Sequence, residues 1–236
     1  MSTKIALWSG PRNVSTALMY SFAQHPLVQV WDEPLFGHFL AHTGVWRPSR
    51  DEVLETMECD ANEVWKKIEA ENKLPFAFLK NMANHLEGLN SKKLKECRNI
   101  VLLRQPSAVI ASYVKQIEKP SLLDLCYPQQ LRIIEYCQSK DLPYLVVDSD
   151  EILKNPQTQL QKMCEFAGLP FNNAMLQWPA GARPEDGVWA KYWYHNVHQS
   201  TGFGAYQTKT RSVPSHLVSL LAESDEFYQK IKKHLL

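Results

Sequence analysis

The stretch IALWSGPRNVSTALMYSF, from Ile5 to Phe22, has the pattern of a strand, a turn and a helix. Its first residues form a short apolar run, Gly10-Pro11 interrupts that run, and Leu18 lies four residues before Phe22, as on one helix face. The N–H groups of a first helical turn have no partners inside the helix, so they can bind an anion. The stretch therefore raises the hypothesis of a phosphate loop, although the lysine of the usual phosphate loop is absent.

The composition is that of one globular domain with almost no net charge. With 236 residues, of which 44% are hydrophobic and 22% charged, the chain can fill one core, and we expect a single α/β domain over residues 1–236. A net charge of +1 gives no bulk attraction to nucleic acid or to an anionic membrane, so neither is expected as a partner. We expect a cytoplasmic protein, because no apolar run reaches the length of a membrane span and the N-terminus lacks a basic and apolar leader.

The cysteine and histidine patterns do not predict a metal site. Five cysteines is an odd number, and no pair has the CxxC spacing of a zinc ligand set, so we expect reduced thiols. His38 and His42 have a spacing that can bind a metal on a helix, but without a clear third ligand they are interpreted as a surface pair. The cysteines concerned are Cys59, Cys97, Cys126, Cys137 and Cys164.

Short apolar runs alternate with helical patterns along the first two thirds of the chain. Strands are predicted at Ile5–Trp8, Leu27–Val30, Phe76–Leu79, Ile100–Leu103 and Tyr144–Val147. Helices are predicted near Ser15–Gln24, Leu35–His42, Asn62–Asn72, Ala83–Leu89, Pro106–Gln116, Tyr127–Ser139 and Pro156–Ala167, then a loop from Pro170 to Pro214 and a last helix. This alternation predicts a parallel sheet of about five strands with helices on both faces, a three-layer α/β/α sandwich.

Ligands of such sheets bind beyond the carboxyl ends of the strands, so the residues that follow each strand are the candidates for a site. The first strand is followed by Gly10–Thr16, which brings a cation, two hydroxyls and a helix N-terminus together. That combination indicates an anion site. The alternative is an ordinary strand-to-helix turn, with Ser15 or Thr16 as the N-cap and Arg12 on the surface.

The fourth predicted strand also ends in a cation. Arg104 follows Leu103, and Gln105-Pro106 then begins a helix that carries Ser112. Two cationic strand ends favour one ligand with two separated anionic groups. The alternative is that Arg104 is a structural residue held in a salt bridge.

The order of these motifs resembles that of sulfotransferases. The loop Gly10–Thr16 is similar to their 5′-phosphosulfate loop, and Arg104-Gln105-Pro106 with Ser112 is similar to their 3′-phosphate motif. Further similarities are Trp31–Phe36 after the second strand, and Val146–Leu153 with the segment up to Phe171. The resemblance implies a P-loop-like fold and binding of 3′-phosphoadenosine 5′-phosphosulfate (PAPS) by Gly10, Pro11, Arg12, Asn13, Val14, Ser15, Thr16, Arg104 and Ser112.

A narrower resemblance covers the rest of the chain. Asp32-Glu33-Pro34, Leu79–Ala83 and Tyr194-His195-Asn196 are similar to a little-characterised sulfotransferase-like group, found as free-standing proteins and fused to aminotransferase-like domains. The chain departs from the wider family where Val14 replaces a loop glycine, Asn13 a serine, and Ala108 a frequent aspartate. A valine at position 14 requires a backbone without positive φ there.

The resemblance implies an enzyme that transfers a sulfuryl group to a hydroxyl or amine of a small-molecule acceptor. Arg12 and the loop N–H groups would stabilise the leaving phosphate oxygen, and no metal is required. A base must take the acceptor's proton, and Glu33 at the end of the second strand is the first candidate. His85, His195 and Lys80 are alternatives, since Met82 occupies the place of the histidine found in cytosolic family members.

Two other functions stay open from the sequence. An ATP-dependent phosphoryl transferase (kinase) would use Asp148 to position magnesium, but Asp148 can equally be a helix N-cap, with Glu151 completing a capping box. A nucleotide-binding module without catalysis is the other. Trp189 is interpreted as packing the late loop onto the sheet, whereas Tyr192, Trp193 and Tyr194 could either pack or line an acceptor pocket.

Overall fold

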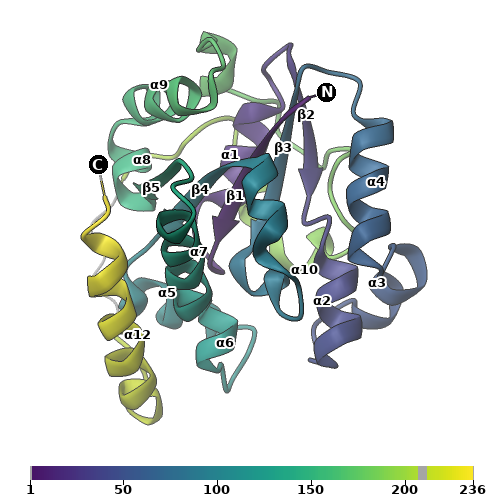
Figure 1. Ribbon diagram of the computed structural model, residues 1–236. Coiled ribbons are helices and arrows are strands. Elements are labelled where there is room, and N and C mark those ends of the chain that lie inside the picture. The colour runs from purple at the N-terminus through teal and green to yellow at the C-terminus, as the bar shows by residue number, and fades with distance from the viewer. Residues whose placement is uncertain (1, 207–211, 236) are drawn as a thin grey trace.

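Five parallel strands form one sheet in the computed structural model, which describes residues 2–206 and 212–235 (Figure 1). Their spatial order is β2-β3-β1-β4-β5. The predicted parallel α/β sheet is confirmed, each strand lying within a few residues of its predicted range. The strands are β1 (Thr3–Ser9), β2 (Val28–Asp32), β3 (Phe76–Met82), β4 (Cys97–Leu103) and β5 (Tyr144–Asp148).

The central strand β1 is buried on both faces. Ile5 and Leu7 pack into one hydrophobic cluster, whereas Ala6 and Trp8 pack into another. Successive side chains of a strand point to opposite faces, so an unbroken apolar run is what a doubly covered strand requires. This is the physical reason that the opening stretch of the sequence places the middle of the sheet.

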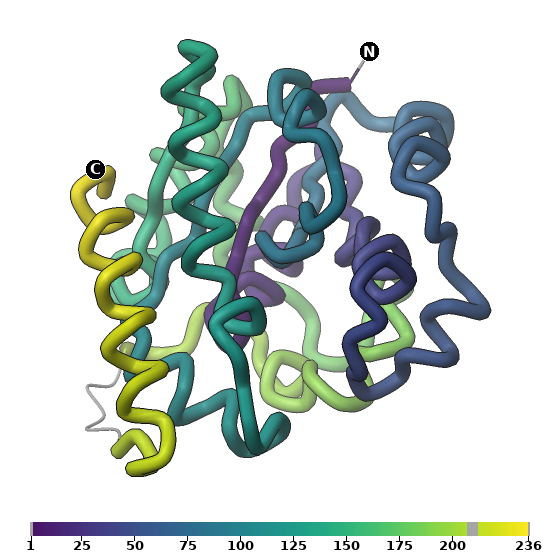
Figure 2. The backbone as a smooth tube through the Cα atoms, turned by 60° about the horizontal axis from the view of Figure 1, so that its bottom comes forward, coloured from purple at the N-terminus to yellow at the C-terminus, as the bar shows by residue number. Residues whose placement is uncertain are grey.

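Helices cover both faces of the sheet and make the predicted three-layer sandwich (Figure 1). On one face lie α1 (Ser15–Phe22) and α9 (Pro156–Ala167). On the other lie α4 (Ala61–Glu71), α7 (Tyr127–Ser139) and α12 (Val218–Lys232), and the last two pack side by side in both views (Figure 2). None of the helices in the described ranges is both long and apolar enough to cross a membrane.

The remaining helical elements are mostly short, and several were not predicted. The predicted helix Ala83–Leu89 is a 3-10 turn that ends at Leu86, close to Gly88 with its φ of 76°. The predicted loop 170–214 contains three short helical elements in its described part, while residues 207–211 lie outside the described residues. The bounds are α2 (Phe36–Thr43), α3 (Arg50–Thr56), η1 (Ala83–Leu86), η2 (Ser91–Glu96), α5 (Pro106–Tyr113), α6 (Leu122–Leu125), α8 (Ser149–Lys154), η3 (Asn173–Leu176), α10 (Ala190–Trp193), α11 (His195–His198) and η4 (Ser215–Leu217).

Neither a disulfide nor a metal cluster joins these elements in the part of the chain that the structure describes. All five cysteines are free thiols, and burial raises the pKa of Cys97 and of Cys126 to about 12. The described residues contain no group of three or more His, Cys, Asp or Glu side chains that could hold a metal ion. His38 and His42 stack, with ring centroids 5.7 Å apart.

The carboxyl ends of the strands lie at the lower end of the molecule in Figure 1, which Figure 2 turns toward the viewer. At this end α2 and α10 lie next to each other and share one hydrophobic cluster (Figure 1). The ring of Phe36 meets that of Trp189 edge to face, with centroids 5.1 Å apart. Segments from the start and the end of the chain therefore enclose the edge of the sheet where a ligand is expected.

A buried polar contact joins β1 to β4 inside the core. The Trp8 indole N–H donates to Asn99 Oδ1 at 2.9 Å, and Asn99 Nδ2 donates to the carbonyl of Leu94 at 2.8 Å. Both side chains are completely buried. Because a buried N–H without a partner is costly, Asn99 fixes how the two strands and η2 pack.

Asn99→Leu should lower the free energy of unfolding by about 2 kcal/mol or more, because it leaves the Trp8 N–H and the Leu94 carbonyl without partners at ~1–3 kcal/mol each. Urea unfolding followed by fluorescence measures the change. The neighbouring exposed residue supplies the control, since Arg98→Gln should leave the unfolding midpoint almost unchanged. A loss below about 1 kcal/mol for Asn99→Leu would contradict this account.

Candidate active site

A cavity of about 970 Å³ opens at the carboxyl ends of the strands. Its walls come from the segments that follow β1, β2, β3 and β4, and from residues 189–204. All nine of the loop and 3′-phosphate residues that the resemblance implies line it, together with Glu33, Lys80 and His85. The sheet thus brings together groups that are far apart in the sequence.

The loop after β1 turns sharply at Arg12, whose φ is 55°. Val14 has a φ of −87°, as a valine requires, so the turn places its left-handed residue at the arginine instead. Val14 is also the N-cap of α1 and provides no side-chain hydrogen bond, while Asn13 Oδ1 accepts from the Ser15 N–H at 3.1 Å. Neither Ser15 nor Thr16 is the N-cap, and no N-cap side chain binds the first-turn N–H groups of α1, whose residues Ser15, Thr16 and Ala17 line the cavity.

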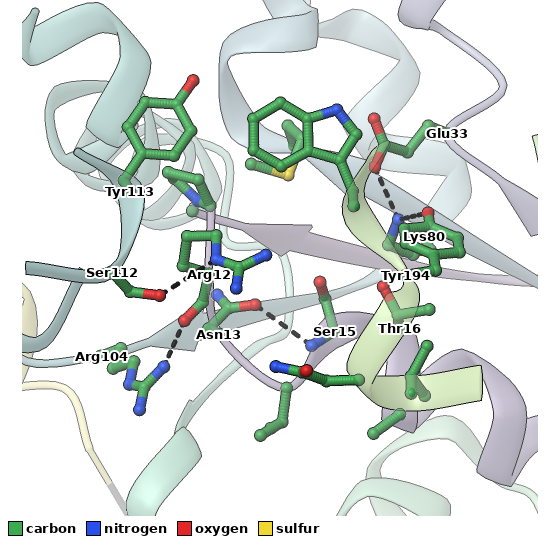
Figure 3. Close-up of a pocket in the computed structure, with 18 of the residues that line it drawn as sticks. Arg12, Asn13, Ser15, Thr16, Glu33, Lys80, Arg104, Ser112, Tyr113 and Tyr194 are labelled. Atoms are coloured by element: carbon green, nitrogen blue, oxygen red, sulfur yellow. Dashed lines mark hydrogen bonds and ion pairs between the residues drawn. The ribbon is translucent and has the colours of Figure 1, made fainter. Parts of the chain in front are cut away.

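The two predicted anion motifs are in direct contact (Figure 3). Arg12 Nε donates to Ser112 Oγ at 3.1 Å, and the Arg104 guanidinium donates to the Arg12 carbonyl. The carbonyl of Arg104 is itself held by the Tyr127 hydroxyl at 2.8 Å. Burial lowers the pKa of Arg12, but a guanidinium stays charged at neutral pH. Two cations and a hydroxyl therefore meet at one end of the cavity.

A second cluster lies across the cavity, around the ammonium group of Lys80 (Figure 3). Lys80 Nζ is 2.8 Å from Asp32 Oδ1 and 2.6 Å from Glu33 Oε1, and the Tyr194 hydroxyl is also hydrogen-bonded to it. Tyr194 contacts both oxygens of Asp32 at 2.8 Å, and the Gly187 N–H donates to Asp32 Oδ2 at 3.0 Å. The cluster ties the ends of β2 and β3 to the late segment that closes the cavity.

The charges in this cluster decide which groups can act as bases. Burial raises the pKa of Glu33, while Lys80 opposes the shift and Asp32 adds to it. Burial alone would lower the pKa of Lys80, but the charges of Asp32 and Glu33 and their hydrogen bonds outweigh it and raise the pKa. Lys80 is therefore a protonated ammonium group that donates hydrogen bonds. The pKa of Glu33 is shifted upward, toward neutral pH, where a general base is most effective.

Of the two candidate histidines, only His85 reaches the cavity. Its ring stacks on Phe36 with centroids 5.2 Å apart, and its Nε2 lies 3.6 Å from Glu33 Oε2. Burial first, and then the charges of Lys80 and Arg47, lower its pKa well below the usual value, so the imidazole is neutral. His195 is exposed and contacts Gln199 at 3.2 Å, and the structure does not bring it into the cavity.

The structure shows the contacts of Trp189 and Asp148, whose roles the sequence alone did not decide. Trp189 is buried, but it packs on Phe36 of α2 and not on the sheet, and its indole N–H donates to the Tyr194 hydroxyl at 3.0 Å. Asp148 caps α8 by accepting from the N–H groups of Asp150 and Glu151, and it does not line the cavity. The N-cap role of Asp148 is confirmed, but the capping box is not, since the Glu151 carboxylate accepts from Lys154 Nζ at 2.7 Å.

The sequence matches the family described as sulfotransferase domain over residues 3–234. The chain belongs to this family. Two relatives from Arabidopsis thaliana, branched-chain-amino-acid aminotransferase-like proteins 1 and 2, are 38% and 37% identical to this sulfotransferase domain. The matches cover 97% and 98% of the domain but 41% and 42% of the relatives, so the chain spans about two fifths of their length.

Solved sulfotransferase structures share the fold of this domain. The sulfotransferase domain of the olefin synthase from Synechococcus PCC 7002 has a TM-score of 0.59 at 16% identity, over 98% of this chain and 95% of that one. The domain from the curacin biosynthetic pathway has a TM-score of 0.58 at 17% identity, over 100% and 99%. A mouse sulfotransferase complexed with PAP has a TM-score of 0.52 at 13% identity, over 99% and 90%. At such identities the likeness shows the fold alone.

Some residues in or next to the cavity of the sulfotransferase domain were not given a role from the sequence. Asp32 stands directly before Glu33 at the end of an apolar strand, and that position was the available signal. Arg47 lies in the connection between α2 and α3 and Asp124 in α6, and neither member of this buried ion pair follows a strand. Tyr194 was left open between packing and lining, and it does both.

Lys80→Met should destabilise the sulfotransferase domain most strongly at neutral and higher pH. Removing the ammonium leaves Asp32 and Glu33 buried without a countercharge, which typically costs ~3–5 kcal/mol. The folded-state pKa of Glu33, which burial already raises, then rises further above its unfolded value, so stability returns as the pH falls through the raised value. Urea unfolding at pH 7.5 and pH 5.5 should show a smaller loss at pH 5.5.

The matched control is Lys66→Met, because Lys66 is an exposed lysine paired with Glu63 at 2.6 Å. It should leave unfolding unchanged at both pH values. An equal loss for Lys80→Met at the two pH values would mean that the missing side-chain packing, and not the missing charge, is the cause.

Proposed function

We propose that this domain transfers a sulfuryl group from PAPS to a hydroxyl or amine of a small-molecule acceptor. One observation carries the proposal: the two anion motifs meet at one end of a cavity whose other end holds a buried carboxylate with a raised pKa. A nucleotide with two separated anionic groups fits the first end, and a reacting hydroxyl fits the second.

The residues at the first end suit a 3′,5′-bisphosphorylated nucleotide. The first-turn N–H groups of α1 and Arg12 would hold the 5′ anion, and Ser112 and Arg104 would hold the 3′-phosphate. The donor supplies an activated sulfuryl group when it is bound. Arg104 directly follows β4, where a magnesium-binding carboxylate would stand in a kinase-like site.

Arg12 and the loop N–H groups would stabilise the negative charge that grows on the leaving oxygen. Preorganised donors of this kind are typically worth ~3–4 kcal/mol each. The turn holds Arg12 in place through the Arg104 guanidinium and Ser112, so little reorganisation is needed. This role requires that the cation be present before the substrate arrives.

Glu33 would take the acceptor's proton, and Lys80 would orient the carboxylate. One oxygen of Glu33 is bound by Lys80 at 2.6 Å, while the other lies 3.6 Å from His85. Lys80 does not serve as the base, because its raised pKa keeps it protonated. The neutral imidazole of His85 is the second candidate, and it lies next to the first one.

Adenosine 3′,5′-bisphosphate should raise the melting temperature without Mg²⁺, whereas ATP should do so weakly. A hundredfold excess over the dissociation constant corresponds to ~2.7 kcal/mol of stabilisation. A shift with ATP that depends on Mg²⁺ would favour phosphoryl transfer instead.

Arg104→Ala should weaken the binding of adenosine 3′,5′-bisphosphate by more than about tenfold. The binding of adenosine 5′-phosphate should weaken only slightly, since it lacks the 3′-phosphate that Arg104 would contact. Calorimetric titration with the two nucleotides measures the difference. Because Arg104 also holds the Arg12 carbonyl, an equal loss for both nucleotides would mean that it acts only by shaping the loop.

Glu33→Gln should keep nucleotide affinity while it lowers the sulfuryl-transfer rate by the ~100- to 10,000-fold typical of a lost general base. In the wild type the rate should fall as the pH decreases through the raised pKa of Glu33, because the protonated carboxyl cannot accept a proton. The rate is measured with saturating PAPS and an acceptor found by screening. A fall below tenfold would move the base to His85, and Glu63→Gln on the exposed face of α4 is the control.

A further inference from the structure

A buried ion pair lies in the wall of the cavity, apart from the two clusters described above. The guanidinium of Arg47 contacts Asp124 Oδ1, and their side chains are only 10% and 9% exposed. Both residues line the cavity. Arg47 lies in the connection between α2 and α3, and Asp124 lies in α6.

Both oxygens of Asp124 are engaged by neighbouring residues, whereas Arg47 has N–H donors to spare for a ligand. The second carboxylate oxygen of Asp124 accepts from the N–H and the hydroxyl of Ser121, at 2.7 Å and 2.8 Å. In the described part of the chain, Arg47 makes hydrogen bonds to Asp124 and to the Trp46 carbonyl, yet a guanidinium carries five N–H donors. Asp124 therefore anchors a fork of donors at the cavity wall.

Apolar rings surround this part of the cavity. Phe36, Phe39 and Trp193 line it, and Tyr113 stacks on Trp193 with centroids 5.9 Å apart. The charge of Arg47 acts on both His85 and Tyr113, so the guanidinium lies within electrostatic reach of the proposed reaction centre. A molecule held by Arg47 would lay its apolar body along these rings and reach Glu33 or His85.

We propose that the acceptor is an apolar alcohol, phenol or amine that carries a carboxylate, and that Arg47 binds this carboxylate. The inference rests on the proposed function and names the substrate class of the same cavity. A planar guanidinium fork matches a carboxylate with two parallel hydrogen bonds. A single negative charge suits the site better than a phosphate, because the carboxylate of Asp124 lies against the same guanidinium.

Matched pairs of acids and amides test the charge without changing the body of the molecule. The probes are 3-(4-hydroxyphenyl)propanoate and 10-hydroxydecanoate, each with its neutral amide. Calorimetric titration into the wild-type protein saturated with adenosine 3′,5′-bisphosphate should show at least one acid binding about tenfold or more tightly than its amide, as expected for a charged, bidentate contact.

The variant Arg47→Gln/Asp124→Asn removes both charges but keeps a hydrogen-bonding pair, which avoids the cost of leaving one buried charge alone. It should lose the preference for the acid while its affinity for adenosine 3′,5′-bisphosphate stays within about twofold. Arg47→Lys should keep only part of the preference, because a lysine lacks the planar fork. Arg50→Gln, a neighbouring arginine outside the cavity, should keep all of it.

If no acid binds more tightly than its amide, including the case in which none binds, the proposal is overturned. A preference that survives in the double variant also overturns it. The bisphosphate titration separates this outcome from failure of the proposed function. Loss of nucleotide binding in the wild type would refute the PAPS assignment, whereas a missing acid preference beside intact nucleotide binding refutes only the role of Arg47.

Discussion

The ammonium group of Lys80 between two buried carboxylates is the contact on which the rest of the site depends. In the register of β2 and β3, Lys80 pairs with Asp32, so the sheet itself sets this contact. Without the ammonium, Asp32 and Glu33 would be two buried like charges without a countercharge. The ammonium group also donates a hydrogen bond to the Tyr194 hydroxyl, and Asp32 accepts one from the Gly187 N–H. Residues 187–194 are therefore held to the sheet by hydrogen bonds to charged groups as well as by packing.

The fold was predictable where local pattern and tertiary burial agree. Each apolar run became a strand because both faces of this sheet are covered, and α2 ends at Gly44 in the left-handed conformation that favours glycine. Hydrophobic periodicity did not predict the one-turn helices, since a helix that short is not stable by itself and depends on tertiary contacts. The turn α10 exists because Trp189 packs on Phe36, a contact between residues far apart in the sequence.

The candidate site was predictable to the extent that parallel strands end at one edge. That rule is enough to bring Arg12 and Arg104 together, and the structure adds their direct contact. The same rule does not predict which of two adjacent side chains faces the cavity and which faces the solvent. Tyr194 is buried against Lys80 while His195 is exposed, and this choice is made by the packing of α10 and α11. The pairing of Arg47 with Asp124 depends on how the connection after α2 is placed against α6, and a local pattern does not encode a contact between residues so far apart in the sequence.

The two residues offered for chemistry share an unusual backbone. Arg12 has a φ of 55° and Glu33 a φ of 45°, a region that costs a non-glycine residue on the order of 1–3 kcal/mol. Surrounding bonds hold both turns: the Glu33 N–H donates to the Lys80 carbonyl at 2.8 Å, and the Arg12 carbonyl accepts from Arg104. Such strain persists only where the rest of the structure imposes it, and it sets the direction of each side chain.

These two turns follow β1 and β2, which flank β3 in the sheet. Strands lie roughly 4.8 Å apart, so two strand spacings separate the turns by about 10 Å. The end of β3, with Lys80, lies between them. Under the proposed function, this spacing would place the transferred group and the acceptor atom between a cation on one side and a carboxylate on the other. The geometry of a parallel sheet thus sets the spacing, and the strained turns direct the two charges across it.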